Sequence, residues 1–337
     1  MANKLLISPA PHLYGKEHTR RIMLDVIIAL TPAVLVSIYF AGLCALSVFA
    51  VSILTCMAVE YLVQRFLLKK PSTLSDLTAI LTAILLALNL PPTSPWWMVM
   101  IGAIVAIGIA KMTFGGLGNN LFNPALVGRV VLLISFPVLM TNWTVPASIF
   151  RAGADAFSGA TPLGILKEEL AKGLTIDQIQ GMYDLSYWHL LWGKIEGSMG
   201  EASAIALLLG FAYLLIRKVI RPHIPLAIFG SIAALTAILW WIDPQHYADP
   251  LFHLLTGGVL LGAIFMATDY VTSPMSTKGM VIFGVGIGVI TALIRIFGAY
   301  PEGVSFAILI MNATVPLINT YCKPKRFGET IKQEEKK

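Results

Sequence analysis

Residues 43–66, LCALSVFAVSILTCMAVEYLVQRF, decide the class of fold. This apolar run is long enough to cross the hydrocarbon core of a bilayer, about 30 Å thick, as one helix. Similar runs recur through most of the chain, which is 57% hydrophobic and 12% charged, with a mean hydropathy of +0.78. The composition therefore excludes a soluble domain and predicts an all-α polytopic membrane protein.

Ten stretches are predicted to span the membrane. The third is short, so it could be tilted, broken or partly interfacial. Residues 1–20 are too polar for a signal peptide, so the first span is expected to be uncleaved. The spans are expected at residues 21–40, 43–66, 76–90, 96–112, 124–141, 201–217, 224–242, 251–268, 279–297 and 303–321.

One long loop separates two halves of five spans each. An odd number of spans places the halves in opposite orientations, which is the geometry of an inverted repeat. A weak echo supports this plan, because Thr93-Ser94-Pro95 follows the third span and Thr272-Ser273-Pro274 follows the eighth. The predicted parts are an N-terminal segment (1–20), a first half (21–141), the loop (142–200), a second half (201–321) and a C-terminal tail (322–337).

Lysine and arginine are unevenly distributed between the two sides of this bundle. With a cytoplasmic N-terminus, 19 of the 24 basic residues fall on the cytoplasmic side, Lys111 and Arg129 among them. Because basic residues accumulate on that side, both termini are expected inside and the loop outside. The net charge of +6 thus reflects orientation, and no nucleic-acid partner is expected. The outer side keeps Arg151, Lys167, Lys172, Lys194 and Arg295.

The outer loop contains the stretch DAFSGATP, which ends at Pro162. Thr161 is a predicted helix N-cap, with Pro162 at the first helical position and Gly173 as the stop. The free N–H groups of a helix start also favour a phosphate, so an ester on the Thr161 hydroxyl would be well placed. Gly159 and Ala160 leave room for a modifying enzyme to approach, and we expect the hydroxyl to be exposed.

Four segments carry a resemblance to a known family. The stretch at 155–161 is similar to the flavinylation motif D-x-x-[ST]-G-A-T, in which a flavin transferase esterifies FMN through its phosphate to the last threonine. The chain resembles the D component of Rnf-type ferredoxin:NAD⁺ oxidoreductases and the homologous B component of sodium-pumping NADH:quinone reductases. Its short N-terminal segment favours the Rnf type. The four segments are SPAPH at 8–12, GGLGNNLFNPALVGR at 115–129, DAFSGATPL at 155–163 and FMATDYVTSP at 265–274.

This resemblance implies particular site residues. Thr161 would carry the covalent FMN, and Asp155, Ser158, Gly159 and Ala160 would complete the motif that the transferase recognises. It also implies a five-plus-five helix plan, urea-transporter-like in outline.

The segment from Phe114 to Pro124 interrupts the helical pattern on the inner side. It could be a loop in which Asn123 caps the next helix, or a re-entrant loop that lines a ligand site. The resemblance implies a second, non-covalent flavin (riboflavin or FMN) on the inner side, and amide side chains suit its carbonyls and ring nitrogens. The candidate residues are Asn120, Asn123, Arg129 and Asp269. Asp269 could equally be a solvated or capping acid.

Aromatic residues follow the predicted loop helix. They are typical of the interfacial belt of membrane proteins, although they could instead stack on an isoalloxazine ring. The four residues are Tyr183, Tyr187, Trp188 and Trp192.

Other cofactor classes find little support in the sequence. Cys44, Cys56 and Cys322 are scattered, which argues against an iron–sulfur cluster or a zinc site, and no metal site is predicted. The six histidines lie in loops or near span ends, which argues against paired haem ligands.

The carboxylates noted within or beside the spans lie near the cytoplasmic ends. Glu60, for example, could pair with Gln64 or Arg65. No carboxylate is predicted at the bilayer centre, so the chain is not expected to contain an ion path of its own. The acids considered are Asp25, Glu60, Asp76 and Asp269.

The resemblance implies a redox subunit of a complex in the bacterial cytoplasmic membrane that couples ferredoxin/NAD⁺ electron transfer to Na⁺ or H⁺ translocation. The chain would not be catalytically complete alone. Its implied partners are iron–sulfur subunits facing NADH and ferredoxin, two small membrane subunits, a second covalently flavinylated subunit and the flavin transferase. Three alternatives remain: the quinone-reductase homologue, a small-solute permease in which Thr161 is only an N-cap, and a structural scaffold.

Overall fold

The computed structural model describes residues 19–69, 71–144, 158–183, 185–193, 196–298 and 300–323. Over these residues the chain is almost entirely helical, and its strands are the two-residue pair β1 (Trp143–Thr144) and β2 (Ser158–Gly159). Four helical segments are long and apolar enough to cross a membrane, and four further apolar helices have 10–17 residues. The chain is therefore a multi-pass membrane protein, as predicted.

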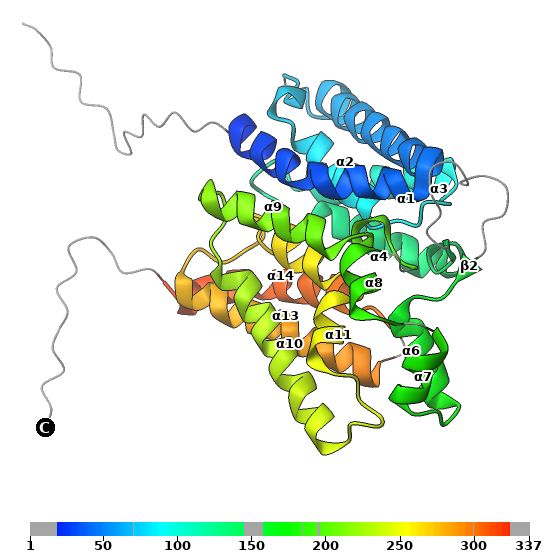
Figure 1. Cartoon of the computed structure of the whole chain (residues 1–337). Helices are drawn as coiled ribbons and strands as arrows, with labels where there is room; N and C mark the ends of the chain where they lie inside the picture. Colours follow the sequence, from blue (N-terminus) through cyan, green and yellow to red (C-terminus); the bar gives the residue numbers. More distant parts are fainter. Residues whose placement is uncertain are drawn as a thin grey trace, which may run out of the picture.

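The first helical segment, α1 (Thr19–Leu62), consists of two helices that meet at Gly42. Gly42 has φ +61° and ψ −139°, a backbone conformation that glycine adopts at little steric cost. The chain reverses direction there (Figure 1). The second helix continues into the π-helical η1 (Val63–Leu67). These two helices correspond to the predicted spans at 21–40 and 43–66.

The rest of the first half consists of short apolar helices. α2 has 11 residues, which is about 16 Å of helix and too short to cross a bilayer core. The third predicted span is therefore short, as expected. The elements are η2 (Leu74–Asp76), α2 (Thr78–Leu88), α3 (Trp96–Ala103), the π-helical η3 (Ile104–Met112), α4 (Pro124–Ser135) and α5 (Pro137–Met140).

The second half also contains an interrupted helix. The prediction of one continuous span over 251–268 is wrong, because the chain leaves the helix at Thr256 and has positive φ at Gly257 (+66°) and Gly258 (+68°). Two successive left-handed residues cannot continue an α-helix. The elements are η4 (Met199–Glu201), α9 (Ala204–Ile216), α10 (His223–Ile242), α11 (Pro250–Leu255), α12 (Val259–Leu261), the π-helical η5 (Gly262–Met266), α13 (Thr277–Phe297) and α14 (Val304–Tyr321).

The two halves pack around one apolar core. α1 contacts both α2 and α9, α14 contacts α4, and α10 lies along α13. The α10–α13 contact is close because α13 presents Gly284 and Gly288. A Cβ on Gly284 would lie 2.6 Å from the Cβ of Ala227, and one on Gly288 would lie 2.9 Å from the Ile228 carbonyl oxygen. Small residues four apart allow this approach in membrane helices.

Three short helices from the predicted outer loop lie together at one end of the bundle. They are α6 (Pro162–Ala171), α7 (Ile176–Tyr183) and α8 (Tyr187–Trp192), and α6 matches the helix predicted at 162–172. Leu163, Ile179 and Phe252 are part of a second, smaller core beneath them. We call this end the loop end. The terminal end lies opposite, where α1 begins and α14 finishes (Figure 1).

The order of elements is similar in the two halves, since each has a short or interrupted third helix. Thr93-Ser94-Pro95 precedes α3 and Thr272-Ser273-Pro274 precedes α13, which are the fourth helices of the two halves. This order agrees with an inverted repeat of five helices, and the full ten-helix arrangement stays a prediction.

Candidate functional sites at the two ends of the bundle

Thr161 lies at the N-terminus of α6 as its predicted N-cap. Its Oγ1 accepts a hydrogen bond from the Gly164 N–H at 3.1 Å, and Pro162 is the first helical residue. Thr161 is only 4% exposed, so little of this residue reaches solvent. The expected room at Gly159 is also missing, since a Cβ there would overlap the carboxylate of Glu196.

The remaining residues of the motif differ in their surroundings. Ala160 is exposed, as expected. The backbone of Ser158 pairs with Thr144 in the small ladder. Asp155 lies outside the described residues. Burial raises the pKa of the Glu196 carboxyl above its ordinary value, so a partly desolvated acid lies directly beside the motif.

Lys167 ties α6 to the end of α13. Its Nζ donates to the backbone carbonyls of Arg295 and Tyr300, each at 3.4 Å, and to that of Gly298. Partial burial lowers the pKa of Lys167, and the three carbonyl oxygens act as acceptors for its ammonium group. The helix that begins at Thr161 is thus held against the second half of the bundle.

The aromatic residues of the loop end divide into exposed and partly buried ones. Trp188 and Trp192 are exposed, as belt residues would be. Tyr187 instead donates a hydrogen bond from its hydroxyl to Asp249 Oδ1 at 2.5 Å. Burial, together with this contact, raises the pKa of Tyr187. Belt and stacking roles both stay predictions.

At the terminal end, Asn120, Asn123 and Asp269 line one cavity, which we call the terminal-end pocket. Its volume is about 80 Å³, smaller than the roughly 300–1,000 Å³ of typical cofactor pockets. Asn120 Oδ1 is buried and has no hydrogen-bond partner among the described residues. Other lining residues are Met23, Thr78, Thr82, Lys111, Phe265 and Tyr270.

Asn123 both caps a helix and lines the terminal-end pocket, as the two interpretations of its segment predicted. Its Oδ1 accepts from the backbone N–H groups of Ala125 and Leu126, at 3.1 and 3.4 Å, so it caps α4. Its Nδ2 donates to the Met266 carbonyl at 3.1 Å and thereby joins the two halves. Asp269 is half-buried in the pocket wall, and its Oδ2 accepts a hydrogen bond from Thr272 Oγ1 at 3.1 Å.

Arg129 does not line this pocket, and its assignment to the second flavin stays a prediction. It lies in the middle of α4, and its guanidinium forms an ion pair with Glu302 and donates to Asn89 Oδ1 at 2.7 Å. The helical position directs the side chain away from the loop that precedes α4. Because Arg129 is buried, it does not lie in a surface loop between spans, where the count of basic residues had placed it.

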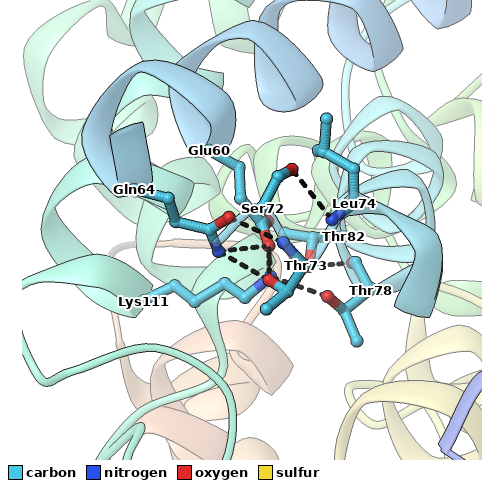
Figure 2. Close-up of polar contacts among 8 residues, drawn as sticks. All are labelled: Glu60, Gln64, Ser72, Thr73, Leu74, Thr78, Thr82 and Lys111. Carbon is cyan, nitrogen blue, oxygen red and sulfur yellow. Dashed lines mark hydrogen bonds and ion pairs between the residues drawn. The ribbon is translucent and has the colours of Figure 1, made fainter. Parts of the chain in front are cut away.

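Glu60 is part of a buried polar cluster that the sequence predicted only in part (Figure 2). The Lys111 Nζ donates to Glu60 Oε2 at 2.6 Å, and the two side chains are 2% and 1% exposed. Gln64, one of the two expected partners, donates to Glu60 Oε1 at 3.3 Å. Among the described residues Arg65 forms no ion pair with Glu60, whose carboxylate is paired with Lys111 instead, so that alternative is wrong.

Two threonines complete this Glu60–Lys111 cluster. Thr73 donates from its hydroxyl to Glu60 Oε1 at 3.1 Å, and Thr78 Oγ1 accepts from Lys111 at 2.8 Å (Figure 2). Lys111 lies in η3 and lines the terminal-end pocket, so it is buried in the bundle and does not lie in a loop between spans. The cluster therefore places the ion-paired ammonium group of Lys111 and the hydroxyl of Thr78 in one wall of the pocket.

Sequence comparison identifies the family of this bundle. The sequence model of the protein family described as NQR2, RnfD, RnfE matches residues 6–328. The chain belongs to the NQR2, RnfD, RnfE family. The match extends over both halves and the loop end, so it includes each of the sites described above.

Relatives within the NQR2, RnfD, RnfE family align along nearly their whole length. The D component of the proton-translocating ferredoxin:NAD(+) oxidoreductase complex of Clostridium ljungdahlii is 43% identical over 326 residues, covering 97% of each chain. The D component of the Na(+)-translocating complex of Acetobacterium woodii is 41% identical over 335 residues, covering 98% of each. The D component of the ion-translocating oxidoreductase complex of Escherichia fergusonii is 39% identical over 351 residues, covering 96% of this chain and 98% of the relative.

Lys111 and Glu201 are among the buried charges of this family member that were missed from the sequence. Lys111 is a lone charge at the end of the apolar run 96–112, and a charge in such a run is a functional-site signal by default. Glu201 stands at the start of the run 201–217, where composition indicates only the boundary of the loop. In both cases the apolar neighbours in the sequence indicated that the charge is buried. Both residues lie at the ends of predicted spans, however, where span boundaries drawn from composition place charges outside the bundle.

Proposed function

We propose that this chain is the flavin-carrying membrane subunit of a redox-driven, ion-translocating complex of the ferredoxin:NAD⁺ oxidoreductase type. Its family and the names of its relatives support the complex, and Thr161 at the start of α6 supports the flavin. Its partners would be the iron–sulfur subunits facing NADH and ferredoxin, two small membrane subunits and a second flavinylated subunit. A flavin transferase would modify Thr161.

The observation that carries this proposal is the position of Thr161 within the sequence DAFSGATP and at a helix N-terminus. Bound as FMN at Thr161, a flavin supplies one- and two-electron transfer. The N–H groups in the first turn of α6 offer donors to a phosphate, and the helix dipole favours its negative charge. Lys167 and its carbonyl partners hold the helix in place.

The burial of Thr161 bears on when modification takes place. Because Thr161 is only 4% exposed, it offers little access to a transferase while α6 is docked. The transferase would therefore act before α6 packs onto the end of α13, or on a state in which Glu196 has moved away from Gly159. In either case the transferase would approach from the side of Ala160, which is exposed.

The terminal-end pocket is the proposed place of a second, non-covalent flavin. The unpartnered Asn120 Oδ1 fits a ring N–H donor, and the Lys111 ammonium fits a ring carbonyl. The cavity volume of about 80 Å³ is too small for the whole ring, so binding requires side chains such as Phe265 to move. With the termini inside, as the distribution of basic residues favours, the two flavins would lie towards opposite faces of the membrane.

The proposal is tested by flavin fluorescence of the denatured chain. The membrane fraction of cells that contain the transferase is separated on a denaturing gel, and a fluorescent band is expected at the mass of this chain. Thr161→Val and Thr161→Asn should both abolish it. Asparagine is a good N-cap and has no hydroxyl, so it separates attachment from capping.

Thr175→Val, at a loop threonine outside the motif, is the matched control and should keep the band. A band that persists in Thr161→Asn, or a wild-type chain that never fluoresces, would refute the proposal. Quinone reduction by the purified complex would instead favour the quinone-reductase homologue. Solute flux through the chain alone, without flavin, would favour the permease.

A further inference from the structure

A second cluster of charges is buried at the loop end. It comprises Arg129 from α4, Glu201 from η4, Arg295 from the end of α13 and Glu302 from the turn before α14, and we call it the loop-end cluster. All four side chains are buried or nearly so. Residues from both halves meet here, next to the break between α11 and α12.

Both arginines have hydrogen-bond acceptors other than Glu201, although the buried Nε of each has no partner among the described residues. Arg129 pairs with Glu302 and donates to Asn89 at 2.7 Å. Arg295 donates to three backbone carbonyls at the end of α11, at 2.6–2.9 Å. The last carbonyls of a helix are natural acceptors for a cationic side chain, so Arg295 needs no carboxylate partner.

Glu201 is left with a single neutral hydrogen bond. Its Oε1 accepts from the Ser198 hydroxyl at 2.8 Å, whereas Oε2 is buried and has no partner among the described residues. The ion pairs of the described chain do not include it. Two glycines enclose the carboxylate: a Cβ on Gly197 would lie 2.9 Å from Oε2, and one on Gly258 would lie 3.4 Å from Oε1.

A cavity of about 10 Å³ lies beside this carboxylate, lined by Glu201, Leu255, Gly258 and other residues of the helix break. This is about the volume that one water molecule needs. Leu255 and its aliphatic neighbours make the rest of the wall apolar. The cavity has room for about one water beside Glu201, whose Oε2 accepts no hydrogen bond from the described residues.

Helix capping does not explain this arrangement. Ser198 and Glu201 have the spacing of a capping box, in which the acid accepts from the backbone N–H of the first residue. Here the acid accepts from the serine hydroxyl, and the turn that follows has only three residues. The buried Oε2 remains unsatisfied in either case.

We propose that Glu201 is a buried proton-binding site, at which Oε2 takes up a proton and exchanges it with water in the adjoining cavity. An ionised carboxylate buried with one neutral hydrogen bond is unfavourable, and protonation removes the charge. The transfer is a simple proton exchange: the O–H bond of a hydronium ion breaks, one forms at Oε2, and no electron moves.

The surrounding charges leave room for this exchange. Arg129 favours the ionised form of Glu201, but its charge is already balanced by Glu302, which opposes a second negative charge. A sodium ion fits less well, because Arg129 Nη1 approaches the same Gly258, at 3.9 Å from a Cβ built there. The charged or titratable groups around the site are Arg129 from α4, Arg295 from α13, Glu302 before α14, His253 from α11 and Lys167 from α6.

The site also lies beneath the helix that begins at Thr161. A Cβ on Gly257 would overlap both the Arg295 guanidinium and the side chain of Leu163, so α6 packs directly on the helix break beside Glu201. This part of the inference rests on the proposed function: a charge that arrives on a group attached to Thr161 would change the proton affinity of Glu201. The chain would then contain a proton site of its own, contrary to the sequence prediction.

Infrared difference spectroscopy of the complete purified complex tests this proposal. A pH step should reveal the carbonyl stretch of a protonated carboxylic acid that shifts in D₂O, and the band should be lost in Glu201→Gln. Glu168→Gln, at an exposed acid of α6, is the matched control and should keep the band. A band that is unchanged in Glu201→Gln, or absent from the wild type at every pH, would overturn the proposal. So would a sodium titration that alters the carboxylate bands of the wild type but not of the variant.

Thermal stability and flavin fluorescence of the same preparations complete the test. Glutamine is nearly isosteric with a protonated glutamate, so Glu201→Gln should assemble with an unchanged Tm, whereas Glu302→Gln should lower Tm by breaking an ion pair. A large loss of Tm in Glu201→Gln would identify an ionised, structural acid instead. In the wild-type complex, absent flavin fluorescence with the acid band present would reject the proposed function alone. Flavin fluorescence without the acid band in the wild type would reject the proton site alone.

Discussion

Removing one partner of the buried Glu60–Lys111 pair should destabilise the protein strongly, while removing both should not. In Lys111→Met the Glu60 carboxylate loses a donor at 2.6 Å and keeps only Gln64 and Thr73, at 3.3 and 3.1 Å. Leaving one charge of a buried pair uncompensated lowers the free energy of unfolding by about 3–5 kcal/mol. The two remaining neutral donors place the expected loss near the lower end, at about 3 kcal/mol.

Glu60→Met should lower the free energy of unfolding by a similar amount, since it leaves a buried ammonium group bonded only to Thr78 at 2.8 Å. The double variant Glu60→Met/Lys111→Met removes both charges. Gln64 and Thr73 still bond each other, at 2.6 and 2.9 Å. Replacing a whole buried pair by apolar side chains is often neutral or stabilising, so the double variant should lie within about 2 kcal/mol of the wild type.

The assay is unfolding of the purified chain in mixed micelles, titrated with a denaturing detergent and followed by circular dichroism. Lys172 and Glu168 on α6 form the matched control pair, at 3.4 Å and 55% and 67% exposed. Exposed pairs of this spacing contribute about 0.3–0.5 kcal/mol, so their methionine variants should be additive and nearly neutral. Additive losses in the Glu60–Lys111 cycle, or single losses below about 1 kcal/mol, would contradict a buried charge pair.

Three further predictions concern the loop end and the helix packing. Glu196→Gln should flatten the dependence of Tm on pH. Because burial raises the folded-state pKa of Glu196, the wild type loses stability as pH rises from the unfolded-state pKa to the folded-state pKa. The variant has no carboxyl group at this position and should not show this loss. Gly284→Ala should lower Tm, because the added methyl group forces α13 away from α10. The control Gly230→Ala, where a Cβ meets open space, should leave Tm unchanged or raise it slightly. Equal Tm values for the two variants would argue against the close helix contact. Lys167→Met should release α6 and speed proteolysis within this helix, whereas the control Lys172→Met should not. Equal cleavage rates in the two variants would show that the carbonyl contacts of Lys167 do not hold α6 in place.

At Thr161, local sequence predicted the secondary structure of the candidate site but not its burial. N-cap chemistry and the Pro162 position predicted the start of α6 correctly, because both depend on residues within one helical turn. The exposure of its hydroxyl could not be predicted in the same way. It depends on the tertiary packing around the start of α6, where Glu196, distant in sequence, closes the space beside Gly159.

The polar residues of the terminal end show the same limit. The Gly- and Asn-rich segment before Pro124 correctly marked Asn120 and Asn123 as neighbours of Asp269 in one cavity. Arg129 was assigned to the same site by its closeness in sequence. The helix of α4 instead turns it towards Glu302, and sequence separation gives no information on such a pairing.

The sequence by itself determined that this is a multi-pass helical membrane protein, because long apolar runs in a bilayer have to satisfy their backbone hydrogen bonds within a helix. It also determined the family, through motifs that extend from one end of the chain to the other. Only the tertiary structure decided which charges are buried together, how Gly257 and Gly258 interrupt a run that composition treats as continuous, and where Glu201 and Lys111 lie. The physical reason is that burial of a charge is a property of what packs around it, and those neighbours come from helices far apart in the chain.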